Sequence, residues 1–322
     1  MRFSKATLAG AMALLAAGSM VLSAESINPP TKPQTAPMTA QEKKNLDTAL
    51  TWWREVIQSR HVELAPKYQA ENYIQHNPNI NTGRDAFVKI FGSRPPVNPI
   101  PEKMDNPPVV MGAKGDFVWL IWEREQKDPR NPDNTYHFNT FDVIRFEKGK
   151  VQEHWDSAQR TPMSPVVEYG VSPKPPMQWN TGKLSPEEEQ TLAVATAEFK
   201  DVLQNAHLEL APKYLHPDYL QHNANFPQGR DALVRIMSQR PGRRPGEEKP
   251  ITPVWPDPPF LTLVNGAYSM MVWERTAKDP DDPSKDYKWY HYDMVRVENG
   301  VVREHWDEFL LNPAPAPAPA RH

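Results

Sequence analysis

The chain has 322 residues, which is enough for about two domains of ordinary size. It contains no cysteine, which excludes disulfides, thiolate metal sites and cysteine nucleophiles. The 37 basic and 40 acidic residues give a formal charge of −3, so the composition offers no electrostatic case for binding nucleic acid.

The first 24 residues are predicted to be a secretory signal peptide. Arg2 and Lys5 precede an apolar stretch rich in Ala, Leu and Met, which ends in small residues near Ala24. This stretch is too short for a membrane span, and no later segment reaches the roughly 20 apolar residues that a span needs. We therefore expect an exported chain, most simply periplasmic or secreted, with no membrane contact after cleavage. Residues 25–38 are expected to be a linker.

The rest of the sequence is an internal duplication. HVELAPKYQAENYIQHN (His61–Asn77) matches HLELAPKYLHPDYLQHN (His207–Asn223) at 11 of 17 positions, 146 residues later. WEREQKDP (Trp122–Pro129) matches WERTAKDP (Trp273–Pro280) 151 residues later, so the second copy has five extra residues in between. Two copies of this length indicate tandem domains and not a solenoid. The expected order is domain 1 (39–161), a Pro-rich linker (162–184), domain 2 (185–311) and a Pro/Ala tail (312–322).

Each copy is predicted to begin with helices. Thr39 with Glu42 forms a capping-box pattern, and Ser185 with Glu188 repeats it, with Pro186 at the first helical position. Apolar residues then recur at helical spacing in both copies. A second short helix is expected over VELAPKY, and a third helix from GRDAFVKIF.

The remainder of each copy is predicted to be β-structure. DFVWLIWERE, HFNTFDVIRFE and KVQEHWD are rich in β-branched and aromatic residues, and Gly or Pro/Asp turns separate them. Helices followed by antiparallel strands indicate an α+β layer fold in each copy.

An amphipathic first helix, YIQHNPNINTGRDAF, a four-strand meander and a closing FDVIRFEKGKVQEHWD together resemble the SnoaL-like branch of the NTF2-like superfamily, over about 120 residues of each copy. The resemblance implies two tandem cones, each a curved antiparallel sheet wrapped around helices and enclosing a pocket. It implies cofactor-free polyketide cyclase-like (aldol-type), isomerase, dehydratase or lyase chemistry, or a pocket protein without chemistry. Such domains commonly pair through their sheets, which implies an internal pseudo-dimer and allows a higher oligomer. Fold alone does not decide function.

The motif EHWD occurs in both copies, at Glu153–Asp156 and Glu304–Asp307. Residues two apart on a strand face the same side, so the His and Asp of each motif are expected to project together. A meander brings the aspartate of the preceding strand beside them, and the family geometry would bring the QHN loop to the mouth of the cone. The predicted catalytic residues are His76, Asp142, His154 and Asp156, and His222, Asp293, His305 and Asp307. The predicted substrate-binding residues are Tyr73, Asn77, Trp122, Tyr219, Asn223, Trp273 and His291.

This set of residues suits proton transfer. An aspartate in an apolar cone resists ionisation, whereas a nearby histidine favours the carboxylate. Such a pair can act as base and acid on an enolisable carbonyl or a β-hydroxy group. Donors such as Asn77 and Tyr73 would steady the developing oxyanion.

Several alternatives stay open. The His–Asp pairs can be structural ion pairs that only fix the strand ends. His76, His154 and Asp156 form a two-His-one-carboxylate set that would suit non-haem iron, although the spacing matches no compact metal motif. There is no G-x-S-x-G elbow, no G-x-G-x-x-G and no P-loop. We predict that neither a cofactor nor a metal is needed.

One difference separates the two candidate sites. Thr140 in the first copy is replaced by His291 in the second, two positions before the aspartate. We therefore expect two pockets with related but unequal preference. The predicted function is an exported general acid–base lyase, cyclase or isomerase for a small apolar carbonyl or hydroxyl compound. The alternatives are a non-catalytic binder of a small hydrophobic ligand, and a scaffold in which the cones are filled.

Overall fold

The computed structural model describes residues 28, 30–165 and 167–313, so the predicted signal peptide and most of the predicted tail lie outside the described residues. The first half has α1 (Ala40–Trp52), a π-helical segment (Trp53–Gln58), a 3-10 turn (Val62–Leu64), α2 (Ala65–Tyr68), β2 (Gln69–Gln75), α3 (Arg84–Phe91), β3 (Val110–Lys114), β4 (Phe117–Lys127), β5 (Thr135–Glu147) and β6 (Lys150–Asp156). The second half has α4 (Pro186–Thr196), a π-helical segment (Ala197–Gln204), a 3-10 turn (Leu208–Leu210), α5 (Ala211–Tyr214), β7 (Leu215–Gln221), α6 (Arg230–Met237), β8 (Leu261–Asn265), β9 (Tyr268–Lys278), β10 (Asp286–Glu298) and β11 (Val301–Asp307).

The two long helices begin where the sequence predicts. The Thr39 hydroxyl accepts a hydrogen bond from the Glu42 amide at 3.3 Å, and the Glu42 carboxylate accepts one from the Thr39 amide at 2.8 Å. Ser185 and Glu188 form the same reciprocal pair at 3.3 Å and 2.8 Å. Each capping box satisfies amide groups that have no partner inside the helix.

Each half contains one curved sheet built around the same meander. Strands β3, β4, β5 and β6 pair antiparallel in order, as do β8, β9, β10 and β11. The last strand of each meander pairs in parallel with a strand that the sequence analysis did not identify, β2 in the first half and β7 in the second. The α+β prediction and the tandem arrangement are confirmed.

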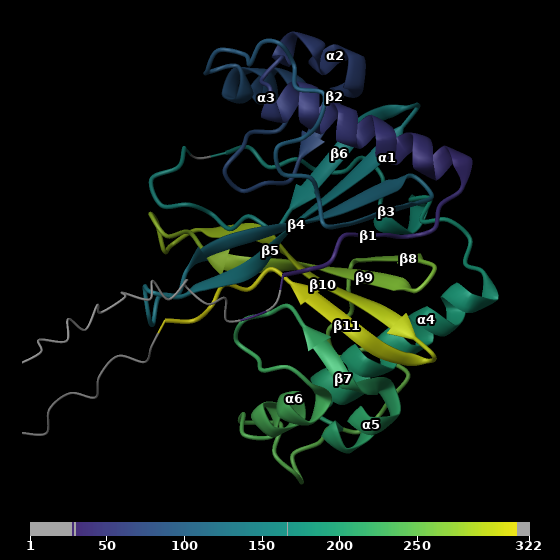
Figure 1. The fold of residues 1–322 in the computed structure, drawn as a ribbon. Helices are drawn as coiled ribbons and strands as arrows, with labels where there is room; N and C mark the ends of the chain where they lie inside the picture. The colour runs from purple at the N-terminus through teal and green to yellow at the C-terminus, as the bar shows by residue number, and fades with distance from the viewer. Residues whose placement is uncertain (1–27, 29, 166, 314–322) are drawn as a thin grey trace, which may run out of the picture.

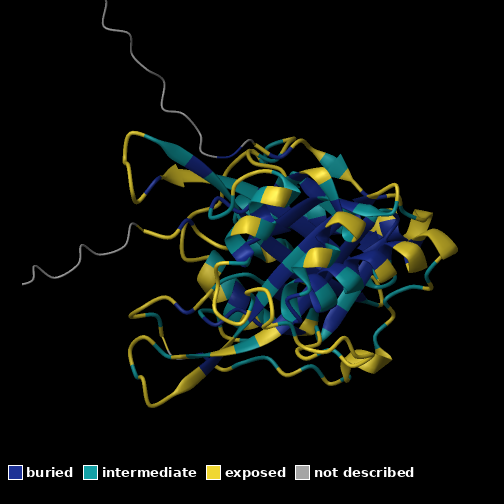
Figure 2. Cartoon of the chain, turned by 90° about the horizontal axis from the view of Figure 1, so that it is seen from below, coloured by how far each residue is buried: buried dark blue, intermediate teal, exposed yellow. Residues whose placement is uncertain are grey.

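Alternation along the strands gives each sheet two different faces. On one face, Val118, Leu120 and Trp122 pack against the helices of their own half. On the other face, Phe117, Trp119 and Ile121 belong to a cluster that includes residues of the second sheet such as Met270 and Trp306. The layers are therefore helices, sheet, sheet, helices, as Figure 1 shows. Buried residues gather in the middle of the molecule and exposed ones at hairpin tips and outer helix faces (Figure 2).

The segment before the first helix connects the two halves. β1 (Gln34–Thr35) pairs in parallel with β3 of the first half. The Gln34 side-chain amide donates to Glu304 of the second half at 3.2 Å. Residues 30–38, predicted as a linker, thus run between the two domains and contact both. Among the described residues, no helix combines the length and apolar character needed to span a bilayer.

Candidate functional site

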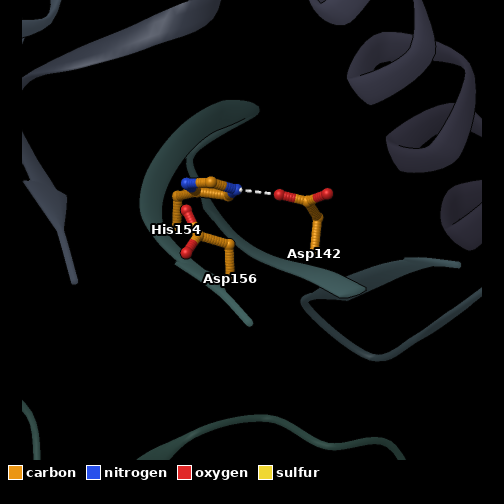
Figure 3. A group of neighbouring side chains, drawn as sticks. All are labelled: Asp142, His154 and Asp156. Carbon is orange, nitrogen blue, oxygen red and sulfur yellow. Dashed lines mark hydrogen bonds and ion pairs between the residues drawn. The ribbon is translucent and has the colours of Figure 1, made fainter. Parts of the chain in front are cut away.

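In the first half, a histidine and two aspartates meet on the helix-facing side of the sheet. Asp142 on β5 lies opposite Asp156 on β6, which brings their carboxyl groups close. The imidazole Nε2 of His154 lies 2.7 Å from Asp142 Oδ1, with Asp156 beside the ring (Figure 3). Trp122 donates its indole N–H to the other oxygen of Asp142 at 2.7 Å. Strand alternation alone places these residues together.

Strand β2, which lies beside β6 in the sheet, and the loop after it supply further contacts to His154 and Asp156. Gln75, at the end of β2, places its side-chain oxygen 3.1 Å from His154 Nδ1. Asn77 donates to Asp156 Oδ2 at 2.7 Å, and the backbone amide of Ala158 donates to Oδ1 at 3.0 Å. Asn77 therefore positions Asp156, and its predicted role as an oxyanion donor stays a prediction.

The second half repeats the arrangement. His305 Nε2 lies 2.9 Å from Asp293 Oδ1, and its Nδ1 lies 2.9 Å from the side-chain oxygen of Gln221. Asn223 donates to Asp307 Oδ2 at 2.8 Å. Two copies of a buried polar network with matching contacts indicate that the network is specified by the sequence of each half.

His291 changes the second network. Its Nε2 lies 2.9 Å from Asp293 Oδ2, and its Nδ1 lies 2.8 Å from Glu308 Oε1. It thereby occupies the position that the Trp122 indole N–H holds in the first half, while the matching Trp273 donates to the Asp257 carbonyl at 3.0 Å. The histidine that is unique to the second copy faces the cone.

The predicted placement of His76 and His222 in the cones is wrong. His76 Nε2 lies 3.1 Å from Glu153, and His222 Nε2 lies 2.9 Å from Glu304. Both imidazoles stack on the EHWD tryptophans, on the opposite face of the sheet from the His–Asp pairs. The cause is strand alternation at the ends of β2, which pairs in parallel with β6, and of β7, which pairs in parallel with β11. Gln75 and Gln221 face the cone, so the residue after each of them faces the opposite side.

This placement also rules out the two-His-one-carboxylate set that included His76. A different donor set is present: ligand atoms of Asp142, His154 and Asp156 lie within 4.8 Å of one another, as do those of Asp293, His305 and Asp307. Both nitrogens of each central histidine already have hydrogen-bonding neighbours, so a metal would have to replace the contact to an aspartate at Nε2 or to a glutamine at Nδ1. The prediction that no metal is needed stays a prediction.

A cavity of about 490 Å³ lies in the cone of the second half. Its wall carries the site residues, and its mouth includes Arg240 and Arg243 from the loop that is longer in this copy. The predicted residues that line it are Tyr219, Asn223, Trp273, His291, Asp293, His305 and Asp307.

The equivalent space in the first half contains more aromatic rings. Trp52, Trp53, Phe87 and Phe91 form a chain of ring contacts with centroids 4.3–6.1 Å apart. Trp53 also stacks on Trp122 at 4.7 Å. The matching residues in the second half are Glu198, Phe199, Leu233 and Met237. Smaller side chains at these four positions explain the space in the second cone. A pocket in the first cone stays a prediction.

Burial and neighbouring charges in the second cone shift the pKa values of its histidine and aspartate side chains. Burial disfavours the imidazolium of His305, but the hydrogen bond to Asp293 and its charge outweigh burial and raise the pKa to about 9. Burial raises the pKa of Asp307 to about 6, with the positive His305 limiting the rise and Asp293 adding to it. The pKa of Asp293 is lowered despite burial, because His291 and His305 flank it. In the first cone, the pKa values of His154 and Asp156 are also raised.

Glu198 is a residue that sequence reasoning missed. Its side chain is fully buried in the π-helical segment behind the cavity, and neither carboxyl oxygen has a hydrogen-bond partner among the described residues. Burial raises its pKa to about 8, so the group is mostly a neutral acid at pH 7. An alignment of the two copies could have identified it, because Glu198 stands at the position of Trp52, which is buried in the first copy.

No protein-family model matches the sequence, and no curated protein matches it. Solved structures do match in fold. An NTF2-like protein of unknown function from Mesorhizobium loti is 19% identical, with a TM-score of 0.26, over 39% of this chain and 94% of its own. A proposed polyketide cyclase from Bacillus cereus is 18% identical, with a TM-score of 0.27, over 40% and 85%. A proposed ketosteroid isomerase from Kribbella flavida is 19% identical, with a TM-score of 0.27, over 41% and 86%.

Each of these matches spans about two fifths of this chain, which is close to one of its two domains. Similarity at this level concerns the fold, and nothing about activity follows from it.

Proposed function

We propose that the chain is a cofactor-independent enzyme that transfers a proton on a small, mostly apolar carbonyl or hydroxyl compound, in the cone of its second half. The observation that carries this proposal is Asp307. Its carboxyl group lines the cavity, and its pKa of about 6 lets it both accept and return a proton near neutral pH. A surface aspartate, with a pKa near 4, would be a much weaker base.

The groups around Asp307 fix its position and stabilise its carboxylate, which suits it to act as a base. Asn223 and the backbone amide of Phe309 donate to its two oxygens at 2.8 Å and 3.0 Å. His305, charged at neutral pH and anchored by Asp293, supplies positive charge beside the carboxylate. Asp307 is thus the general base, and the buried histidine positions and charges the site without needing to contact substrate.

Tyr219 supplies the complementary acid. Its hydroxyl lines the same cavity, and burial raises its pKa well above the usual value, so it stays protonated. The side-chain amide of Gln221 donates to its oxygen at 3.4 Å, which leaves the hydroxyl hydrogen available for a ligand. A C–H proton next to a substrate carbonyl would pass to Asp307, while the enolate oxygen accepts a hydrogen bond from Tyr219. Return of the proton, or attack of the enolate carbon on a second carbonyl, gives isomerase or aldol-type chemistry.

The first half carries the same His–Asp pair with bulkier surroundings. Trp52 and Trp53 pack beside His154, with ring centroids 6.2 Å and 6.3 Å away. We propose that this cone accepts smaller ligands than the second, or serves as a folded partner for it.

We further propose that the protein is exported and acts in the periplasm or outside the cell. The basic and then apolar order of the first 24 residues supports this, and the absence of cysteine is compatible with it. The N-terminal sequence of the protein purified from its native cells tests it: a mature chain that begins near residue 25 is expected, and one that begins at Met1 would contradict export.

The test of the enzymatic function compares Asp307→Asn with the matched first-half variant Asp156→Asn. On a panel of aldol-type and enolisable ketone substrates, Asp307→Asn should lose about 100-fold or more in kcat while its affinity for ligand changes little. Asp156→Asn should keep most of the turnover in the second cone.

The second candidate function is a non-catalytic binder of small hydrophobic molecules, which the apolar part of the cavity wall (Phe199, Leu203, Leu233 and Met237) also suits. It predicts equal ligand binding by the parent and both variants, with no turnover by any of them. That result would replace the enzymatic proposal.

A further inference from the structure

A second cavity, of about 470 Å³, lies outside both cones. It is bounded by the linker residue Trp179 and the EHWD residue Trp155 on one side, and by Phe260, Tyr287 and Tyr290 of the second half on the other. His76 forms part of its wall. This cavity (the cleft site below) involves none of the residues assigned to proton transfer above.

The equivalent position in the other half of the molecule shows which contacts such a site makes. In the second half, the residue that matches His76 is His222, and its Nδ1 lies 3.1 Å from the hydroxyl of Thr31. The backbone amide of Thr31 donates to Glu123 of the first half at 2.5 Å. Thr31 thus presents two hydrogen-bond donors to one imidazole and one carboxylate across the interface between the halves.

The equivalent acceptors line the cleft site, but the chain does not fill it. Glu274, which stands 151 residues after Glu123, lines the cavity together with His76. Met177 stands 146 residues after Thr31 and is 90% exposed, so its side chain does not occupy the cleft. Both sites therefore present a histidine and a glutamate as acceptors, and a residue of the chain itself contacts only one of these pairs, through Thr31.

The imidazole of His76 is oriented to accept a hydrogen bond. Its side chain is 6% exposed, and Nε2 lies 3.1 Å from Glu153, which Arg145 Nε also contacts at 2.8 Å. Burial lowers the pKa of His76, so the ring is neutral and carries its proton on the nitrogen that faces the carboxylate. Nδ1 then bears a lone pair, and in the part of the chain that the structure describes no hydrogen-bond partner for it is found.

The charge at the mouth favours a neutral ligand. The Glu274 carboxylate pairs with Lys288 at 2.7 Å and accepts a hydrogen bond from the Tyr290 hydroxyl at 3.4 Å. The cavity lining carries two basic residues, Lys174 and Lys288, and two acidic ones, Glu274 and Asp286, so it offers no net charge to attract an ammonium group. A carboxylate oxygen has further lone pairs, so Glu274 still accepts a hydrogen bond from a hydroxyl.

We propose that the cleft site binds a neutral aromatic compound with hydroxyl groups, a phenol of about two rings, which donates to His76 Nδ1 and to Glu274 and packs against the aromatic wall of the cavity. The rings of Trp155, Trp179 and Phe260 contact one another at angles of 48–78°, with centroids 5.3–6.5 Å apart, and together form an aromatic wall of the cavity. Flat aromatic faces of this kind bind planar rings well. This proposal is independent of the reaction proposed for the second cone.

The test uses naphthalene-2,6-diol and its dimethyl ether as probes, with binding to the full chain measured by titration calorimetry. The diol should bind in the cleft, and the ether, which lacks both donors, should bind at least about 10-fold more weakly. His76→Phe keeps the ring stacked on Trp155 but removes the acceptor, and it should weaken the diol by a similar factor. His222→Phe is the matched control and should not change affinity, because Thr31 already occupies that nitrogen.

A second variant keeps the test decisive. Trp179→Ala removes a partly exposed wall and should also reduce diol affinity about 10-fold or more, whether or not His76→Phe folds. Asp307→Asn should leave diol binding in the cleft unchanged and so separates this site from the cone. Equal binding of diol and ether, or diol binding that ignores both His76→Phe and Trp179→Ala, would overturn the proposal. So would binding of methyl glucoside in place of the diol.

Discussion

The two halves of the molecule share a polar network and differ in what surrounds it. Both place a histidine beside two aspartates. A glutamine contacts the Nδ1 of the histidine, and an asparagine donates to the aspartate of the EHWD motif. Around that network the first half has four large aromatic rings, and the second has a glutamate, one phenylalanine and two aliphatic side chains. The comparison teaches that the network carried by the strands and the packing carried by the helices are separable, and that the helix side chains decide how much space each cone leaves.

Filling the second cone should have the largest effect. The double variant Phe199→Trp with Leu233→Phe makes its helices resemble those of the first half, and it should reduce ligand affinity about 100-fold or more by occupying the cavity. Calorimetric titration with any ligand found for the cone checks this. Unchanged affinity would mean that the four helix positions do not separate the halves.

Glu198 should make the second half sensitive to pH in a way that the first is not. Its pKa of about 8 in the folded protein is above the usual value of 4.5, so the folded state holds a proton that the unfolded state loses. The contribution of Glu198 to stability is therefore complete below about pH 4.5 and falls as the pH rises toward 8, and Glu198→Gln should remove this part of the pH dependence. We expect the change in unfolding free energy between pH 5 and pH 8 to differ between the two proteins by about 3 kcal/mol in urea unfolding. Parallel pH profiles for both proteins would contradict a buried neutral Glu198.

His291 is the next difference to remove. His291→Thr restores the residue of the first half but leaves Asp293 Oδ2 and Glu308 without their shared partner. Leaving these two buried carboxylates without the His291 imidazole should lower the free energy of unfolding by about 2 kcal/mol. Thr140→His in the first half has no matching carboxylate pair prepared for it and should bring no gain. A stabilised His291→Thr protein would show that the third histidine is not structural.

The helix caps should behave alike in both halves and give the smallest effect. Thr39→Ala and Ser185→Ala each remove one side of a capping box and should each cost about 1 kcal/mol of stability by urea unfolding. A large difference between the two would show that one helix start depends on tertiary contacts more than the other.

Local patterns predicted the strand-borne part of the site well. The i, i+2 spacing in EHWD fixes which side His154 and Asp156 face, and the meander brings Asp142 opposite them, because alternation and short hairpins depend only on nearby residues. The capping residues Thr39 and Ser185 were predictable for the same reason.

Long-range arrangements could not be predicted in this way. The position of His76 depends on parallel pairing between β2 and β6, strands separated by most of the domain, and alternation at the end of β2 then sends it to the opposite face. The cleft site depends on how the two sheets pack, which no single repeat specifies. Glu198 is different: a charged residue at a position that is a buried tryptophan in the other copy was visible in the sequence.

The pH dependence of kcat/KM for the second cone tests the central claim most directly, because it reports the free enzyme's essential base. The rate should rise with pH through an apparent pKa of about 6, as Asp307 loses its proton. Asp156→Asn should keep that inflection and Asp307→Asn should lose it together with the activity. A profile without an inflection near pH 6, or one that survives in Asp307→Asn, would contradict the assignment of Asp307 as the base.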